Sequence, residues 1–236
     1  MLPIGWIFTR DRPEDHGLLP DGAAQPDDST DRPREPLEAN WTLGQATKTS
    51  AFWLITAGAV SMSMLNTGLT FHLFNIFEDS GLSRTVAASV FVPIAATGAI
   101  MQLASGIAVG RVPVHVLQAL ALFLNALILI MAATLSSPEM AYGFGVAMGL
   151  QGGIEMLVIS VVYANYFGRQ HLGSIAGLAA TIGVAGSALG PMPLGIARDL
   201  LGSYSTVLIG FAALPFALGI ACLLFCRPPG EPPPGN

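Results

Sequence analysis

The residue with the clearest chemical potential is Glu155, which is the one charged residue between Glu139 and Arg169. A carboxylate within a membrane is costly, and such groups usually face a cavity or a partner. Gln151 precedes it by four residues, which places both side chains on one face of a helix. A protonated Glu155 could share a hydrogen bond with Gln151. The pair fits a group that couples proton movement or contacts a substrate; the alternative is a neutral glutamate bonded to a neighbouring helix for packing specificity.

Four further polar residues lie close together upstream. Asn66 and Thr70 are one helical turn apart, and Thr67 lies beside Thr70. A helix here would carry a polar stripe that lines a water-filled path. His72 lies roughly 200° around the same helix from Thr70. It is either a titrating gate or an interfacial packing residue.

The remaining isolated polar residues have simpler interpretations. We expect Gln102 and Asn125 to make hydrogen bonds between helices. Cys222 and Cys226 are four residues apart, too far along a helix for a relaxed disulfide, and are expected to be small packing residues. Arg198 lies at an expected helix C-terminus, where a cation complements the helix dipole.

Catalytic chemistry finds no support in these residues. The chain has no CxxC, HExxH, GxSxG or P-loop pattern. An enzyme in a membrane would be expected to cluster several polar groups at one depth, whereas here a single carboxylate stands alone. We therefore expect no enzyme activity, no cofactor and no metal site.

The elements that must position these residues are membrane-spanning helices. Of the 236 residues, 52% are hydrophobic and 11% are charged, against about 25% charged in soluble domains. This composition excludes a water-soluble globular protein, and the lack of a basic patch excludes a nucleic-acid binder. A spanning helix needs roughly 20 apolar residues. Six charge-poor windows meet this length and predict an all-α integral membrane protein, with spans at 50–77, 86–109, 114–134, 140–166, 172–197 and 203–226.

The spans divide the chain into three segments. Residues 1–49 begin with an apolar stub, MLPIGWIF, and continue as a polar, proline-rich stretch that holds nine acidic and five basic residues. This stretch is predicted to be a cytoplasmic linker. Residues 50–226 form the six-helix transmembrane domain. Residues 227–236 form a disordered cytoplasmic tail.

The orientation follows from the Lys and Arg residues outside the spans. With six spans, both termini lie on the same side, together with eight of the ten basic residues. Both termini are therefore predicted to be cytoplasmic, in a multi-pass protein of the cytoplasmic (inner) membrane. The eight residues are Arg10, Arg12, Arg32, Arg34, Lys48, Arg111, Arg169 and Arg227.

Glycines recur every four residues in several spans, most clearly at Gly145, Gly149 and Gly153. Small residues at this spacing let membrane helices approach closely. They serve packing alone, or they form smooth faces that slide in a conformational cycle.

Several segments carry a resemblance to a known family. The matching segments are RDRPEDHGLLPDG (10–22), WTLGQATKTSAFWLITAG (41–58), TGLTFHLFNIF (67–77), YFGRQHLGSIAGL (166–178) and GSALGPMPLG (186–195). The chain resembles bacterial transporters of the major facilitator superfamily, and among them the monocarboxylate-porter-like branch. The likeness extends over essentially the whole chain.

Two motifs of the family are only partly kept. GSALGPMPLG, with Gly186, Gly190, Pro191 and Gly195, is similar to the GxxxGPxxGG signature of antiporters. Leu194 replaces one glycine, so an antiport mechanism is not inferred. In GIAVGRVPVH (106–115), only Gly106 and Arg111 match the family's GxLADRxGRR loop.

The resemblance implies a fold and a function. Such transporters have twelve helices in two halves, each an inverted repeat of three helices, and this chain resembles the second half with the loop before it. The first, second, fourth and fifth spans would then line the substrate path. The implied function is a share in secondary active transport of a small solute by alternating access, coupled to protons or another ion, and the branch suggests a monocarboxylate as that solute. The implied partners are the lipid bilayer, the small-molecule substrate and a separate N-terminal six-helix half. The alternative is a non-transporting truncated remnant or a membrane interaction module.

Overall fold

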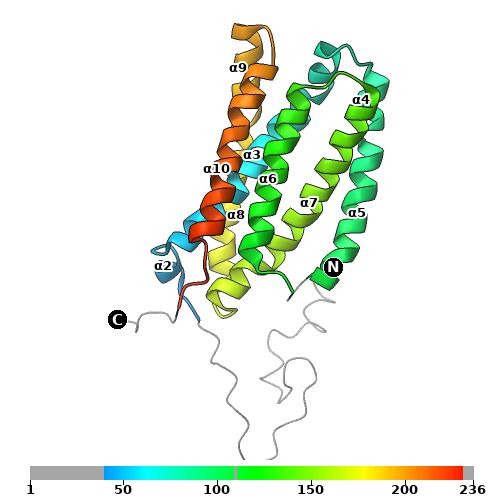
Figure 1. Ribbon diagram of the computed structural model, residues 1–236. Helices are drawn as coiled ribbons and strands as arrows, with labels where there is room; N and C mark the ends of the chain where they lie inside the picture. Colours follow the sequence, from blue (N-terminus) through cyan, green and yellow to red (C-terminus); the bar gives the residue numbers. More distant parts are fainter. Residues whose placement is uncertain (1–39, 109–110, 231–236) are drawn as a thin grey trace, which may run out of the picture. The chain divides into compact units, whose positions relative to one another are not determined.

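The computed structural model describes residues 40–108 and 111–230, and these residues form helices joined by short connections, without strands. Consecutive membrane-length stretches run antiparallel to one another (Figure 1). The helices are α2 (Leu43–Ala46), α3 (Ser50–Asp79), α4 (Arg84–Ser89), α5 (Phe91–Ala108), α6 (Val114–Ala133), α7 (Pro138–Phe167), α8 (Leu172–Leu189), α9 (Pro191–Leu201) and α10 (Ser205–Phe225).

Six stretches within the described part of the chain are long and apolar enough to cross a membrane, which confirms the predicted fold class. Four of them are single helices, namely α3, α6, α7 and α10. Two are each built from two helices, α4 with α5 and α8 with α9. The predicted ends differ by a few residues: α3 continues to Asp79, and the fifth span continues to Leu201.

Polar caps and glycines fix the helix ends. The Thr49 hydroxyl accepts from the Phe52 amide at the start of α3, and the Ser137 hydroxyl accepts from the Met140 amide at the start of α7. Gly168 adopts a φ of 79° just after α7, a conformation that glycine takes at little cost. Pro138, which lies between the predicted third and fourth spans, begins α7, because proline suits the first helical turn, where its missing N–H is not needed.

Prolines explain the two broken spans. Pro93 has no N–H to donate to the carbonyl of Ser89, and α4 ends at Ser89 while α5 begins at Phe91. Pro191 likewise cannot donate to Ser187, and α8 gives way to α9 at Gly190. By contrast, Pro215 lies inside α10 without interrupting it.

The helices differ widely in how much of their surface is buried inside this bundle. Helix α6 packs against α10, α7 and α3, α5 packs against α7, and α8 packs against α3 (Figure 1). In α6 and α7, half or more of the most apolar 18-residue stretch is buried. In α4–α5 only 11% of the corresponding stretch is buried, and in α8–α9 only 17%. Helices α5 and α8 therefore leave broad faces uncovered by the described part of the chain.

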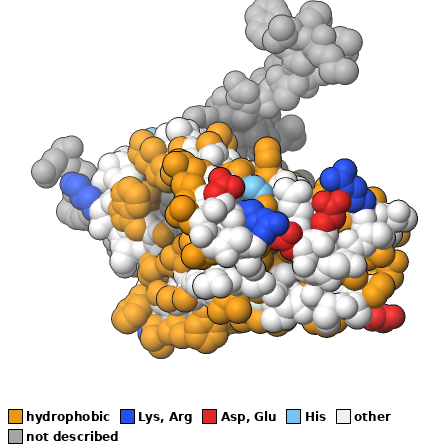
Figure 2. All heavy atoms as spheres, turned by 90° about the horizontal axis from the view of Figure 1, so that it is seen from above, with side chains coloured by type: hydrophobic (Ala, Val, Ile, Leu, Met, Phe, Trp, Pro, Cys, Tyr) orange, Lys and Arg blue, Asp and Glu red, His pale blue; other side chains and the backbone are white. Residues whose placement is uncertain are grey.

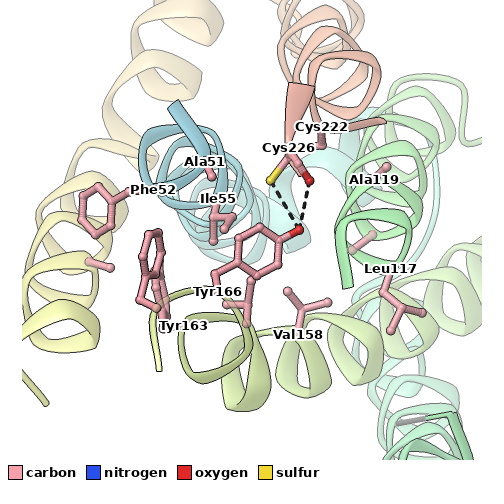
Figure 3. Close-up of a cluster of buried hydrophobic side chains, with 14 of the residues drawn as sticks. Ala51, Phe52, Ile55, Leu117, Ala119, Val158, Tyr163, Tyr166, Cys222 and Cys226 are labelled. Atoms are coloured by element: carbon pink, nitrogen blue, oxygen red, sulfur yellow. Dashed lines mark hydrogen bonds between the residues drawn. The ribbon is translucent and has the colours of Figure 1, made fainter. Parts of the chain in front are cut away.

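The buried side chains form two apolar clusters along the bundle. The first includes Phe52, Tyr163, Tyr166 and Cys222 and extends to Met62 (Figure 3). The second begins at Leu65, Ala126 and Ala147 and extends to Phe77 and Phe144. Between these clusters lies a layer of polar side chains, described below.

Folded structure begins before the first span. Trp41 is buried, and its amide donates to the Phe167 carbonyl at 3.0 Å. Thr42 and Gln45 form a capping box on α2. The last residues of the segment 1–49 thus pack on the bundle, whereas residues 1–39 and 231–236 lie outside the described residues.

The two ends of the bundle carry different charges. One end, here called the basic end, carries Lys48, Arg111, Arg169 and Arg227 with His115 and His171, and no Asp or Glu among the described residues. The opposite end, here called the acidic end, carries Glu78, Asp79, Glu139 and Asp199 with Arg84 and Arg198. Figure 2 views the molecule from the side of α4 and α9 and shows acidic and basic side chains gathered on that face.

Candidate functional site

The polar layer consists of three amides that lead to Glu155. Asn125 on α6 donates from Nδ2 to Oδ1 of Asn66 on α3, at 2.7 Å. Asn66 donates from Nδ2 to Oε1 of Gln151 on α7, at 3.1 Å. Gln151 donates from Nε2 to Oε2 of Glu155, at 2.9 Å. We call these four residues the amide chain; it joins three spans at one depth.

The amide chain has a direction. Every amide donates its proton toward Glu155, so the carboxyl group accepts from Gln151 and does not donate to it. Nε2 of Gln151 also lies 3.4 Å from the sulfur of Met62, a weak acceptor. Two acceptors therefore hold the Gln151 amide in this orientation.

Because the amide chain is largely buried, its polar atoms need hydrogen-bond partners within the protein. The Gln151 and Asn125 side chains are fully buried, whereas Asn66 and Glu155 are partly exposed. Oδ1 of Asn125 has no hydrogen-bond partner among the described residues. Buried polar groups need partners, because an unpaired one keeps its full desolvation cost. The amide chain thus begins at α6 with an oxygen that lacks a hydrogen-bond partner among the described residues and ends at the ionisable group of Glu155.

The expected polar stripe of α3 is divided between two environments. Asn66 points into the bundle and belongs to the amide chain. Thr70 is exposed and Thr67 is partly exposed, and neither joins this chain. Asn66 and Thr70 lie one turn apart on α3, as their spacing predicts. Their exposure differs because Asn66 meets side chains of α6 and α7, whereas Thr70 does not join them.

His72 lies near the acidic end, away from the amide chain. Its Nε2 is 3.1 Å from the Pro191 carbonyl oxygen, which only accepts, so Nε2 carries the proton. Its Nδ1 is 3.1 Å from the Tyr204 hydroxyl, which donates to it when the ring is neutral. His72 therefore ties α3 to α9 and to the start of α10.

A polar cavity of about 410 Å³ surrounds this histidine. Arg198 lines it and pairs with Asp79 at 2.9 Å, while its guanidinium lies 5.7 Å from the centre of the Tyr204 ring. Arg198 also donates to the Gly202 carbonyl just after α9, as expected for a cation at a helix C-terminus. The lining consists of His72, Asn75, Glu78, Asp79, Gly195, Arg198, Asp199 and Tyr204.

The glycine-proline motif of the fifth span packs against α3. A Cβ on Gly190 would lie 2.1 Å from the Met64 carbonyl oxygen, and one on Gly186 would lie 2.5 Å from a methyl group of Val60. Pro191 begins α9 and offers its carbonyl to His72, whose ring would lie 3.8 Å from a Cβ placed on Gly195. This motif thus brings α8 and α9 against α3.

The glycine ridge of α7 meets α5. A Cβ on Gly149 would lie 1.9 Å from the Thr97 hydroxyl oxygen, and one on Gly153 would lie 2.4 Å from Cβ of Met101. Beside this contact runs an open groove of about 440 Å³, whose lining includes Gln102, Gly152 and Met156. The second and fourth spans therefore share both a close contact and an accessible surface.

The partly kept loop motif falls at the basic end. Gly106 lies in α5, in a stretch whose side-chain surroundings are outside the described residues. Arg111 is exposed and lines a separate cavity with His115. No group of three or more His, Cys, Asp or Glu residues in the described part of the chain could hold a metal ion.

Two members of these sites were not among the sequence candidates. Asn125 was expected to make only a helix–helix hydrogen bond, and it does so as the first member of the amide chain. The signal was present, since an asparagine within a span is unusual. Tyr204 had no such signal, because its contact with His72 joins residues 132 positions apart.

Comparison with known protein families gives a match over most of the chain. The family model described as "Major Facilitator Superfamily" matches residues 1–191, which include the first four spans and most of the fifth. No curated protein is similar enough to this chain to count as a match. The family match covers well over half of the 236 residues and agrees with six membrane-capable helices. The chain is therefore a multi-pass membrane protein that belongs to the Major Facilitator Superfamily, a family of membrane transporters of small solutes.

Proposed function

We propose that this chain acts as the second six-helix half of a secondary active transporter, and that Glu155 is its proton-coupling group. The observation that supports this most is the amide chain, which places the one carboxylate of the described membrane interior at the end of three oriented hydrogen bonds. An intramembrane carboxylate with a named partner is a functional-site hypothesis in any transporter.

The neutral partner suits a proton-coupling role. Gln151 presents both a donor and an acceptor, so a half-turn of its amide would let it accept from a protonated Glu155. A basic partner would hold the carboxylate charged throughout. Glu155 can therefore gain and lose a proton while it keeps a hydrogen bond to the same residue.

The uncovered faces of α5 and α8 support a partner domain. In transporters built from inverted repeats, substrate sites lie near the midplane between domains that rock against each other. The groove between α5 and α7 opens on such a surface. We propose that an N-terminal six-helix half covers these faces and that transport proceeds by alternating access.

The proposed substrate is a small monocarboxylate. Among the described residues no Lys or Arg lies between the two ends of the bundle. A cation that holds the substrate carboxylate would therefore come from the N-terminal half. Motion of substrate and proton together across the cytoplasmic membrane would make the protein a symporter of acids.

The test is uptake of labelled lactate into proteoliposomes that contain the chain, with and without a six-helix half encoded upstream of it. An inward proton gradient is expected to drive uptake only when both halves are present. Glu155→Gln should abolish the response to the gradient, because glutamine keeps the shape but does not titrate. Glu155→Asp, which titrates, should retain part of it.

Two outcomes would contradict the proposal. An unchanged pH dependence in Glu155→Gln, at equal amounts of protein in the membrane, would remove the proton role. No uptake with either composition would argue against transport of these acids and favour the second candidate, a non-transporting remnant or membrane interaction module.

A further inference from the structure

A second cavity, of about 340 Å³, lies at the basic end. It opens between the start of α6, the last turns of α7 and the chain just beyond α10. It is separate from both the amide chain and the cavity around His72. Its lining comprises Arg111, Val112, Pro113, Val114, His115, Leu117, Leu157, Val161, Asn165, Tyr166 and Pro228.

The cavity has a polar side and an apolar side. Arg111, His115 and Asn165 supply the polar groups, and the side chain of none of them makes a hydrogen bond or ion pair with another described residue. Leu117, Leu157 and Val161 belong to the membrane-spanning helices α6 and α7 and supply an apolar wall. A ligand that fits must therefore be polar at one end and apolar at the other.

The charge around the cavity selects an anion. Every Lys and Arg at this end adds positive charge, and the nearest acidic residue along α7 is Glu155, deep in the span. The groups that face the cavity are Arg111 before α6, His115 on α6, Asn165 and Tyr166 on α7, and Pro228 after α10. None of these groups carries negative charge near neutral pH.

The wall of the cavity is held in place by a contact between helices. The Tyr166 hydroxyl donates to the Cys226 carbonyl oxygen at 2.9 Å, which joins the end of α7 to the end of α10 (Figure 3). The same view shows Val158 on α7 and Leu117 on α6. This part of the cavity is therefore formed before any ligand arrives.

We propose that this cavity binds one anionic phospholipid from the adjacent leaflet. The lipid phosphate contacts Arg111 and His115, and an acyl chain lies along Leu117, Leu157 and Val161. Basic pockets between membrane helices are suited to lipid headgroups in this way. A soluble anion would leave the apolar wall in water. The site is independent of the transport proposal, because it involves neither Glu155 nor the amide chain.

The test is native mass spectrometry of the full chain in detergent, with phosphatidylglycerol and phosphatidylcholine of identical acyl chains offered in equal amounts. We expect phosphatidylglycerol to be retained in preference. Arg111→Gln should lower that preference by about fivefold, the effect of one basic residue near an anionic lipid. Lys48→Gln is the matched control, because it removes the same charge from the same end outside the cavity.

A second variant tests the apolar side. Val161→Phe places a ring in the cavity without a change of charge and should reduce retention of both lipids. Circular dichroism and gel filtration confirm that each variant keeps its helices and its size.

Three results would overturn the proposal. Equal retention of both lipids, or equal losses in Arg111→Gln and Lys48→Gln, would show that the cavity does not select an anionic headgroup. Displacement of the lipid by millimolar glycerol 3-phosphate would identify a soluble anion as the ligand. A photo-crosslinker at position 165 that reacts with residues 1–38 and not with lipid would identify the acidic segment of the chain itself as the occupant.

Discussion

At the scale of single residues, Glu155 meets an amide and not a base. Gln151 passes on the orientation of Asn66, which in turn follows that of Asn125. Rotation of one amide in such a chain leaves its neighbours with two donors or two acceptors face to face. The amides therefore turn together or not at all, and the state of Glu155 is coupled to helix α6.

This coupling predicts unequal effects of two substitutions. Asn125→Leu removes one hydrogen bond and one unsatisfied buried oxygen, and it leaves unpaired only the oxygen of the partly exposed Asn66. Asn66→Leu removes two hydrogen bonds and leaves both the Gln151 oxygen and the Nδ2 group of the buried Asn125 unpaired. Interhelical hydrogen bonds in membranes are worth about 0.6 kcal/mol on average. We expect Asn125→Leu to change the free energy of unfolding by less than about 1 kcal/mol, and Asn66→Leu to lower it by about 1–2 kcal/mol.

Unfolding in mixed micelles of increasing SDS content measures both values. The double variant should show a loss smaller than the sum of the two, because the bond between Asn66 and Asn125 is counted twice. Strict additivity of the two losses would show that the amide chain is not an energetic unit.

At the scale of helices, close contacts fix which spans pair. The ridge of α7 approaches α5 at Gly149, where any side chain would meet the Thr97 hydroxyl and the Ile94 carbonyl. Without a hydrophobic force between helices in lipid, such backbone approach supplies the packing energy. The pairing of α5 with α7 therefore depends on the lack of a side chain at this position.

Gly149 and Gly152 form a matched pair for testing this dependence. Both lie in α7, but a Cβ on Gly152 would have nothing within 4 Å, while one on Gly149 would lie 1.9 Å from Thr97. Gly149→Ala should destabilise the protein by about 1–3 kcal/mol through overpacking. Gly152→Ala should be neutral or stabilise it by up to about 1 kcal/mol through helix propensity.

Thermal unfolding followed by circular dichroism compares the two variants in one detergent. Equal melting temperatures would mean that α5 does not approach α7 this closely in the folded protein. We expect Gly149→Ala to lower the melting temperature. Adding Thr97→Ser to this variant should not restore it, because serine keeps the oxygen that the new methyl group meets.

At the scale of the whole molecule, charge separates the two ends. Among the described residues, the basic end carries four Lys and Arg residues and no Asp or Glu. The acidic end carries four carboxylates and two arginines. Since Lys and Arg are retained in the cytoplasm during insertion, we propose that the basic end is cytoplasmic. The lipid cavity at that end would then face the inner leaflet.

Engineered cysteines test this orientation. Ser136 and Gln170 are both exposed, the first in the connection at the acidic end and the second in the connection at the basic end. A membrane-impermeant maleimide should label Ser136→Cys in intact bacterial cells and Gln170→Cys only after the membrane is opened. The unmodified chain is the control, since Cys222 and Cys226 are buried. The reverse pattern would place the basic end outside.

The sequence by itself determined the six spans and their order, because the bilayer imposes a local rule that apolar length alone satisfies. It also singled out Glu155 and Gln151, whose contact lies within one helix and follows from helical spacing. Helix ends were less predictable: Pro191 breaks the fifth span between α8 and α9, Pro138 begins α7, and Pro215 lies inside α10 without interrupting it.

Only the tertiary structure decided which polar residues meet. Asn66 and Gln151 are 85 residues apart, Asn66 and Asn125 are 59 apart, and His72 and Tyr204 are 132 apart. Helical periodicity fixes which residues share a face, but not the rotation of that face toward a particular neighbour. That rotation depends on the glycines that let α7 approach α5 and α9 approach α3. Packing therefore turned Asn66 into the amide chain and left Thr70, one turn away, at the surface.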